Sequence, residues 1–439
     1  MRKTFLLIVV IALVLIVGIG IVFLRAVPES DARLLSENPR LLSGLRLVPA
    51  GADAIVLAPS AKGLLRALKG NKVTATAVTD WETKSELRAL RLVPGELDLI
   101  AWRLEDKLFF AIACSPMQRS LIRTGSRFNS DAPAFRSDGE WLTTAPRVTE
   151  PSAWSELKSM AEGRTGKLFF YLTPRERNFL ASPGKPAFVA VDLKPDVVTV
   201  RSSSRNSPVV PSDESHSFAF PRSALLSMRL QKAPQVLAEI EKLTRVKLSN
   251  LIAAGGMLSV YKVDDRKAIP RLQGVIVISA DQQKAVELAA VVENLAPSVG
   301  GTLGRLLGGA RRRSERSGPE GTAVVRVESV GYTVEHAYTE RELIVSLDKS
   351  SMDLYLIDRK GAPPSPPEVQ WTLRLEEAEL RRIAKVGEND ALRLFAPEVS
   401  NRIQELTRIS SLIPEGCLLE ATSTTAEAYD EILATVTAK

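Results

Sequence analysis

The sequence predicts an α+β protein, with a single N-terminal transmembrane helix followed by duplicated ferredoxin-like (βαββαβ) units that carry extended antiparallel sheets. Three observations lead to this prediction: an apolar run near the N-terminus, two similar successions of strand and helix patterns, and two linkers rich in serine or proline. The length of 439 residues suits about two to three domains, and 45% hydrophobic with 25% charged residues is typical of a globular chain.

An apolar run from Phe5 to Leu24 predicts the transmembrane helix. All but three of its 20 residues are Ile, Leu, Val or Phe, and a helix of about 20 such residues spans the hydrocarbon core of a bilayer. A cleaved signal peptide is the alternative, but its apolar region is usually about 7–15 residues long and ends in a small-x-small site, which "FLRAVPES" lacks. We therefore expect residues 1–28 to form a cytoplasmic tip and an uncleaved anchor in the lipid bilayer.

Basic residues set the expected topology of a single-pass protein of the cell membrane. Arg2 and Lys3 precede the span, and the positive-inside rule places the N-terminus in the cytoplasm and the bulk of the chain outside it. The net charge of +7 comes from 58 basic and 51 acidic residues spread along the chain, which indicates a solvated surface. With 5% aromatic residues and an extracytoplasmic location, we expect no nucleic-acid partner.

Residues 29–204 make up the first predicted α+β unit. Short apolar runs bounded by turn residues predict its strands, and apolar positions at the 3.6-residue period predict its helices. In order, the elements are strand Ala52–Ala58, helices "SAKGLLRALKG" and "WETKSELRALRL", strands Glu96–Leu104 and Lys107–Cys114, helix "SPMQRSLIRTG", strand Glu140–Pro146, and further strands "KLFFYL", "AFVAVDL" and "VVTVRSSS". This order is βαββαβ with one additional helix and a sheet extension.

Residues 216–360 make up the second predicted unit, with a clearer βαββαβ order. Ser279 and Gln282 have the spacing of a capping box ahead of its second helix. The elements are strand Ser223–Leu230, helix Ala233–Lys247, strands Met257–Val263 and Gly274–Ser279, helix Asp281–Ala296, strand Thr322–Val330, and further strands "YTVEHAY", "ELIVSL" and "DLYLI".

A short repeat and a longer one both occur just before strands, and only the longer one supports a duplication of the units. "LRLVP" begins at Leu45 and again at Leu90, but both copies lie within the first unit, so we interpret them as similar entries into strands. Proline cannot donate a ladder hydrogen bond and therefore suits the residues just before a strand. The larger duplication pairs Pro49 with Pro221, each a few residues before the first strand of its unit.

The segments Ser202–Ser215 and Lys360–Glu368 are the predicted linkers, because serine and proline disfavour regular packed structure. Residues 368–439 follow the second linker and are either a partial third unit or the completion of the second sheet. Their predicted elements are strand "VQWTLRL", helices "EEAELRRIAKV" and "APEVSNRIQELTRI", strand "CLLEATS" and a final helix "AEAYDEILATV".

The two cysteines, Cys114 and Cys417, are candidates for a disulfide, because an extracytoplasmic location permits one. Both lie in apolar stretches, where a lone cysteine more often packs as a small buried hydrophobe. The two histidines, His216 and His336, lie 120 residues apart, and the chain has no H-E-x-x-H or C-x-x-C pattern. We expect no metal and no cofactor.

A glycine- and arginine-rich stretch, from Gly300 to Gly318, is the most prominent charged motif. It lacks the G-x-x-x-x-G-K-[ST] pattern of a phosphate loop. It is either a mobile basic loop or a contact for an anionic group on a lipid or a polymer. The candidate contact residues are Arg305, Arg311, Arg312, Arg313 and Arg316.

Catalytic patterns are weak in this sequence, and we assign no catalytic residue. A G-x-S-x-G elbow is absent. Glu377 and Arg381 stand at i,i+4 among Glu376, Glu379 and Arg382, which is typical of ion pairs on an exposed helix face.

The stretch "EIEKLTRVKLSNLIAAGGMLSVYKV" (Glu239–Val263), followed by "GVIVISADQQKAVELAAVVENL" (Gly274–Leu295), resembles a family of membrane-anchored bacterial proteins of unknown function. Those proteins share a helix, a glycine pair, an apolar strand and then a strand–helix pair. The resemblance covers about the middle third of the chain. It implies an anchored, duplicated α+β ectodomain and assigns no role to any residue.

These observations lead to a functional hypothesis. We expect a non-enzymatic, membrane-anchored extracytoplasmic protein that acts by binding or scaffolding in the bacterial cell envelope, with an envelope protein as its unidentified partner. One alternative is a carrier or sensor for an apolar ligand such as lipid, because a sheet covered by helices can enclose an apolar pocket. Another is a hydrolase whose site is dispersed along the chain.

Overall fold

The chain divides into two units, which are described separately below. Unit 1 comprises Met1–Ser207, Ser411–Leu419 and Ala426–Lys439, and unit 2 comprises Pro208–Ser410 and Glu420–Thr425. The computed structural model describes residues 33–35, 38–75, 96–105, 107–127, 135–146, 154–173, 185–205, 218–230, 238, 255–264, 271–299, 312–329, 332–339, 341–346, 348–360, 364–366, 368–386, 413–425 and 429–438. The described residues confirm the α+β class, with a large antiparallel sheet and few helices.

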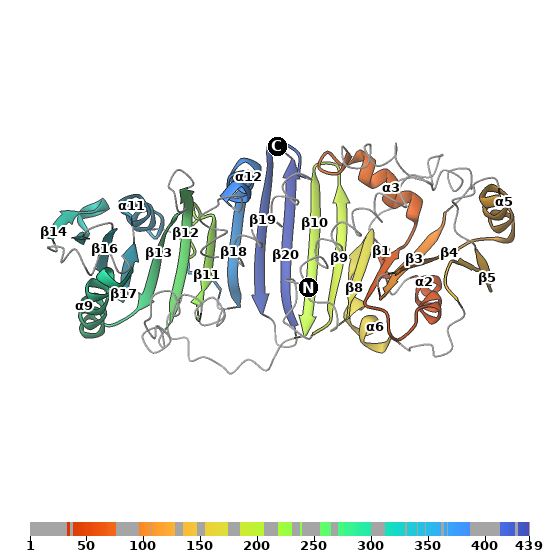
Figure 1. The fold of residues 1–439 in the computed structure, drawn as a ribbon, viewed down its shortest axis with the longest axis horizontal. Coiled ribbons are helices and arrows are strands. Elements are labelled where there is room, and N and C mark those ends of the chain that lie inside the picture. Colours follow the sequence, from red (N-terminus) through yellow and green to blue (C-terminus); the bar gives the residue numbers. More distant parts are fainter. Residues whose placement is uncertain are drawn as a thin grey trace. The chain divides into compact units, whose positions relative to one another are not determined.

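Unit 1 is built around an antiparallel sheet with the strand order β5-β6-β4-β3-β2-β8-β9-β10-β20 (Figure 1). A separate pair, β1 (Arg33–Leu34) with β7 (Thr165–Gly166), lies outside this order. The other elements are α2 (Pro39–Gly44), β2 (Ala54–Ala58), α3 (Ala61–Gly70), β3 (Asp98–Leu104), β4 (Lys107–Ala113), α5 (Pro116–Arg127), β5 (Arg136–Asp138), β6 (Trp141–Thr143), α6 (Ser155–Ala161), β8 (Leu168–Leu172), β9 (Ala187–Lys194), β10 (Val197–Arg205) and β20 (Tyr429–Ala438).

Unit 2 contains an antiparallel sheet with the order β14-β15-β16-β17-β13-β12-β11-β18. Strand β19 (Cys417–Thr425) is divided between the units, and in unit 2 its Glu420 pairs with Arg374. The other elements are β11 (Leu226–Arg229), β12 (Gly256–Asp264), β13 (Arg271–Ser279), α9 (Gln282–Val299), β14 (Arg312–Ser317), β15 (Ala323–Ser329), β16 (Tyr332–Thr339), β17 (Glu342–Ser346), α11 (Lys349–Asp358), β18 (Val369–Glu376) and α12 (Glu377–Val386).

The two units share a succession of paired strands. Unit 1 has the order β5-β6-β4-β3-β2-β8, and unit 2 has the order β16-β17-β13-β12-β11-β18. Both first strands also follow the same turn: Ala52 N donates to Pro49 O at 3.0 Å, and Ala224 N donates to Pro221 O at 3.4 Å.

The ferredoxin-like arrangement is wrong for the described strands. In a split βαβ arrangement the first two strands of a unit run parallel and are not neighbours, because the third strand lies between them. Here β2 pairs directly with β3, and β11 pairs directly with β12, and both pairs are antiparallel. The order of strands and helices along the chain was predicted well here, but that order does not decide which strands lie side by side.

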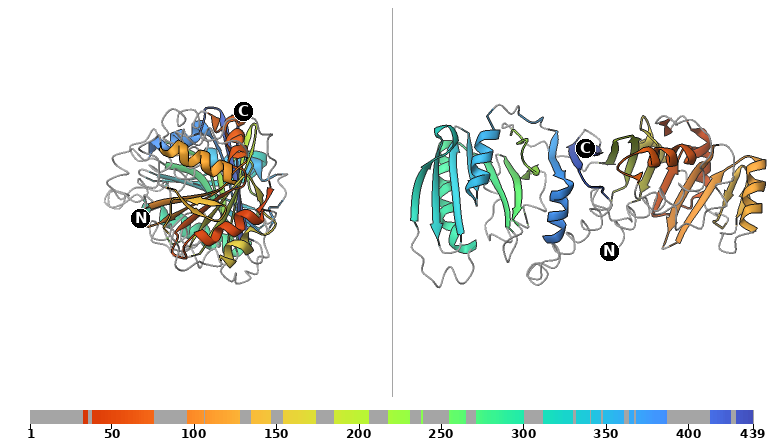
Figure 2. Two further views of the ribbon diagram at one scale, coloured as in Figure 1. Left: turned by 90° about the vertical axis from the view of Figure 1, so that its right-hand side faces the viewer. Right: turned by 90° about the horizontal axis from the view of Figure 1, so that it is seen from above.

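Apolar residues cover both faces of the unit 1 sheet. In β2, Ile55 and Leu57 belong to one buried cluster, whereas Val56 and Ala58 belong to another. Because successive side chains of a strand point to opposite faces, a strand buried on both faces has a continuous apolar sequence. Figure 2 shows the red to orange helices α2 and α3 beside these strands.

Two predicted elements have the wrong secondary structure. Residues 353–357, "DLYLI", lie in α11 rather than in a strand: Asp348 accepts a hydrogen bond from Ser351 N at 2.7 Å, and Met352 and Tyr355 are buried on one helical face. Residues 429–436 of the predicted final helix lie instead in β20, because β10 offers nine partner positions that a local pattern does not reveal. The C-terminal segment is therefore divided, since β18 and α12 belong to unit 2 and β20 to unit 1.

Other predictions concern helix starts and linkers. Asp281, not Ser279, caps α9, because its Oδ1 accepts from Lys284 N at 2.8 Å. Within the second predicted linker, Ser365 N donates to Phe218 O at 2.9 Å, so this segment is packed against unit 2. The predicted helices "WETKSELRALRL" and "APEVSNRIQELTRI", and nearly all of Ala233–Lys247, lie outside the described residues.

The predicted anchor, from Phe5 to Leu24, also lies outside the described residues. Within the described part of the chain, no helix combines the length and hydropathy that a membrane crossing requires.

Candidate functional site

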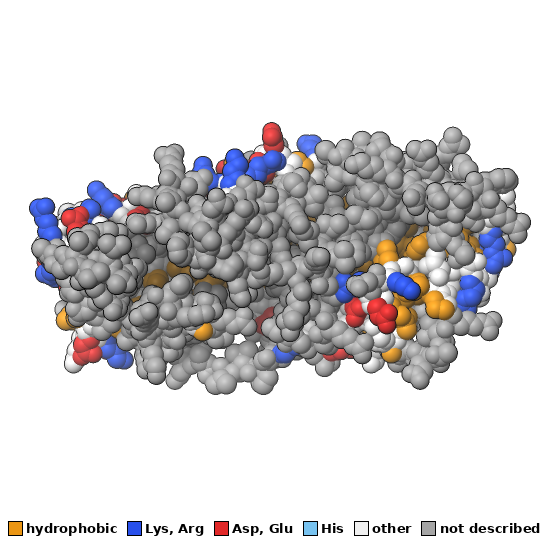
Figure 3. All heavy atoms as spheres, viewed as in Figure 1, with side chains coloured by type: hydrophobic (Ala, Val, Ile, Leu, Met, Phe, Trp, Pro, Cys, Tyr) orange, Lys and Arg blue, Asp and Glu red, His pale blue; other side chains and the backbone are white. Residues whose placement is uncertain are grey.

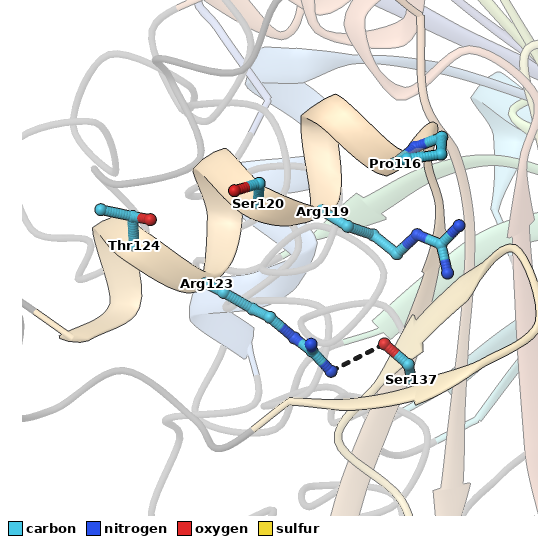
Figure 4. Close-up of a pocket in the computed structure, with 6 residues that line it drawn as sticks. All are labelled: Pro116, Arg119, Ser120, Arg123, Thr124 and Ser137. Atoms are coloured by element: carbon cyan, nitrogen blue, oxygen red, sulfur yellow. Dashed lines mark hydrogen bonds between the residues drawn. The ribbon is translucent and has the colours of Figure 1, made fainter.

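A shallow basic pocket in unit 1 is the candidate site. It lies between α5 and β5 and has a volume of about 380 Å³ (Figure 4). The pocket contains two guanidinium groups and three hydroxyl groups. Its lining residues are Pro116, Arg119, Ser120, Arg123, Thr124 and Ser137.

The local sequence explains how α5 presents these side chains. Ser115 and Gln118 form a capping box at the helix start: Gln118 N donates to Ser115 Oγ at 3.3 Å, and Ser115 N donates to Gln118 Oε1 at 2.7 Å. Ile122 is buried and holds the opposite side of the helix against the core. Arg119 and Arg123 stand one turn apart and therefore lie on the same side of the helix.

The two arginines are held by uncharged acceptors. Arg119 donates to the carbonyl of Gly139, and Arg123 Nη2 donates to Ser137 Oγ at 2.7 Å, as Figure 4 shows. Gly139 has a φ of +60°, which a glycine adopts without steric cost in the turn between β5 and β6. These bonds orient the two guanidinium groups toward β5 and the turn that follows it.

Acidic residues near the pocket already form ion pairs with other arginines. Among the described residues, Asp98, Asp138 and Glu140 supply carboxylates that form ion pairs at this end of the unit. Their pairs are Arg40 with Glu140 at 3.0 Å and with Asp98 at 3.9 Å, Arg46 with Asp138 at 3.5 Å, and Arg136 with Asp138 at 3.3 Å. Figure 3 shows basic side chains on the surface at the end of unit 1 that carries α5.

The buried Cys114 lies just before α5, and nearby arginines affect the pKa of its thiol. Burial away from water raises the pKa of its thiol to about 11, while Arg119, Arg40 and Arg123 lower this pKa in part through their positive charges. Two of these three arginines, Arg119 and Arg123, also line the pocket.

We expect Cys114 to resist alkylation in the native protein. At pH 8 a thiol whose pKa is about 11 is a thiolate in only about one molecule in a thousand, and the thiolate is the reactive form. Iodoacetamide labelling followed by mass spectrometry should therefore modify Cys114 slowly in the native chain and rapidly after unfolding in urea. Equal rates in the two states would contradict the burial and the raised pKa.

The candidate disulfide is not formed in the structure. Cys114 and Cys417 are both buried as free thiols. Burial also raises the pKa of Cys417.

The arginines that the sequence singled out lie in a different environment. Arg305 and Arg311 fall outside the described residues, while Arg312, Arg313 and Arg316 lie in β14, which pairs with β15 and is not a mobile loop. Arg313 Nε lies 3.5 Å from Glu293 Oε1, and Arg316 binds Glu335 and Asp353. Carboxylates of unit 2 thus compensate Arg313 and Arg316.

The remaining polar candidates have structural partners. His336 Nε2 lies 2.8 Å from Glu293 Oε1, and His216 is outside the described residues. No group of three or more His, Cys, Asp or Glu in the described part of the chain is arranged to hold a metal. The predicted pairing of Glu377 with Arg381 is confirmed, although Glu377 is buried rather than exposed.

Sequence reasoning missed the pocket. The pair of arginines at i,i+4 in "SPMQRSLIR", directly after an S-x-x-Q box, was the available signal. Ser137 lies 14 residues beyond Arg123, and only the packing of β5 beside α5 brings the two together.

Comparison of the chain with protein-family models, with curated proteins and with solved structures found no match.

Proposed function

We propose that this protein is a membrane-anchored, extracytoplasmic component of the bacterial cell envelope that acts by binding, and that its pocket on α5 and β5 binds a phosphate-bearing group. We further propose that its ectodomain arose by duplication, which the shared strand order and the matching turns at Pro49 and Pro221 support. The arginine-lined pocket is the observation on which the binding proposal rests.

The donors of the pocket suit a phosphate. A phosphate presents several strongly accepting oxygens, and a guanidinium fork binds two of them at once. Arg119 and Arg123 supply such forks, and Ser120, Thr124 and Ser137 add hydroxyl donors. The hydrogen bonds to Gly139 and Ser137 hold both guanidinium groups at the pocket, where an anion can reach them.

The lining side chains favour binding over catalysis. A serine or threonine nucleophile needs an adjacent base, and the lining residues of this pocket are proline, arginine, serine and threonine. Arginine remains protonated in proteins and does not serve as that base.

We expect the full-length chain in a neutral detergent to bind glycerol 1-phosphate but not glycerol. The variant Arg119→Gln/Arg123→Gln should bind it at least about tenfold more weakly, because each charge-assisted hydrogen bond contributes about 1.5–3 kcal/mol. Phosphorus NMR titration measures both affinities, and higher salt should weaken binding to the unaltered chain.

The matched control is Arg312→Gln/Arg313→Gln, which removes two exposed arginines from β14 in unit 2. This control should bind glycerol 1-phosphate as the unaltered chain does. Loss of binding in the control, with retention in the α5 variant, would place the anion site on β14 and overturn the proposal.

A further inference from the structure

We propose that α5 docks on an anionic lipid surface, with a lipid phosphate in the arginine-lined pocket and the side chains of Met117 and Leu121 inserted beside it. This inference rests on the proposed function and names the source of the phosphate. The observation behind it is a pair of exposed apolar side chains on the helix that forms the pocket.

Met117 is 69% exposed and Leu121 is 40% exposed. They stand at i,i+4, so they form a single apolar row on the surface of α5. Water contact with such side chains is unfavourable, and transfer of their area out of water would drive docking on an apolar phase.

The rows of α5 are arranged as an interfacial helix requires. At 3.6 residues per turn, the row of Met117 and Leu121 and the row of Arg119 and Arg123 fall on opposite flanks of the exposed face. The hydroxyl residues of the pocket, Ser120 and Thr124, lie between these rows, and both are exposed. Helices that lie in a membrane interface place basic and apolar side chains in this way, toward the headgroups and the acyl chains respectively.

A lipid accounts for both rows, whereas a soluble phosphate or a phosphorylated polymer accounts only for the arginines. Anionic lipid surfaces attract arginine and lysine side chains. The predicted anchor from Phe5 to Leu24 would also hold the chain at a bilayer, so even weak contacts of α5 would meet a high effective concentration of lipid.

The test uses the full-length chain reconstituted in nanodiscs of phosphatidylcholine, with and without phosphatidylglycerol. Hydrogen exchange of the α5 amides, read by mass spectrometry, should slow by about tenfold when phosphatidylglycerol is present, because docking suppresses helix opening. Arg119→Gln/Arg123→Gln and Met117→Ser/Leu121→Ser should each abolish most of this protection.

A matched control is Val286→Ser, which removes another exposed apolar side chain, 66% exposed, from α9 in unit 2. This control should leave the protection of α5 unchanged. Circular dichroism of each variant checks that the chain is folded.

The two readouts together distinguish failure of the lipid docking from failure of the phosphate pocket. Binding of glycerol 1-phosphate without protection of α5 in anionic nanodiscs would overturn the proposal that α5 docks on lipid, but it would agree with the proposed phosphate pocket. Equal protection with and without phosphatidylglycerol, or protection that survives Met117→Ser/Leu121→Ser, would also overturn it. Loss of both readouts in the unaltered chain would overturn both proposals, and arginine- and Met/Leu-dependent protection would support both.

Discussion

Replacing Arg316 with methionine is expected to lower the free energy of unfolding of unit 2 by about 3–5 kcal/mol, the usual cost of leaving a buried charge without its partner. Arg316 Nη2 lies 2.5 Å from Glu335 Oε2, and its Nη1 lies 2.8 Å from Asp353 Oδ1. The Glu335 side chain is fully buried, with an exposed fraction of 0%. Once Arg316 is replaced, Arg326 is the only cation within 4.0 Å of the Glu335 carboxylate among the described residues.

The arginine stays charged while it is bound. Its hydrogen bond to Glu335 is the largest of the effects that raise its pKa, with smaller contributions from Asp353, and these outweigh the effect of burial.

Hydrogen exchange of the β14, β15 and β16 amides in the full-length chain measures this effect. A loss of about 3 kcal/mol should speed exchange through unfolding by about a hundredfold. Arg313→Met is the matched control on the same strand, because Arg313 is 57% exposed and its ion pairs are solvated. Equal effects of the two substitutions would contradict the assignment of Arg316 as a buried structural cation, and Glu335→Gln added to Arg316→Met should restore part of the stability.

Replacing Arg229 with methionine is expected to lower the free energy of unfolding of unit 2 by about 3 kcal/mol, because a hydrogen bond to a charged group contributes about 1.5–3 kcal/mol. Arg229 is 1% exposed. Its Nε donates to Val369 O at 2.9 Å, and its Nη2 donates to Ser365 O at 3.1 Å and to Pro366 O at 3.3 Å. Methionine keeps the apolar stem but removes these donors.

The Phe220 ring, 5.7 Å from the Arg229 guanidinium carbon, would also lose its cation–π contact. Faster exchange of the β11 and β18 amides and earlier proteolytic cleavage near Ser365 are the expected readouts. Arg222→Met, which alters an exposed arginine in the turn before β11, should leave both unchanged. Unaltered exchange in Arg229→Met would show that the proline-rich segment holds its position without the guanidinium.

These two arginines illustrate what the sequence could not reveal. Arg316 was predicted as one of five similar basic residues, yet its surroundings differ completely from those of Arg313, three residues away on the same strand. Arg229 attracted no attention in the sequence, because its acceptors lie about 140 residues further along the chain. The proline-rich segment was predicted as a linker for the same reason.

Elements whose signal is local were predicted well. The continuous apolar run of β2, the hairpin of β3 and β4 around a short polar turn, and the periodic pattern of α9 all appear where the sequence places them. Each depends on residues within a few positions of one another, through side-chain alternation, turn geometry or helical spacing.

The sequence by itself thus determined the α+β class and most of the strands and helices of the described residues, because these follow from short-range patterns. Only the tertiary structure decided that β20 is a strand, that the first two strands of each unit pair directly, and that α5 and β5 together form a basic pocket. Those features depend on hydrogen bonds and packing between segments far apart in the chain, whose free energy overrides local preference and leaves no periodic trace in the sequence.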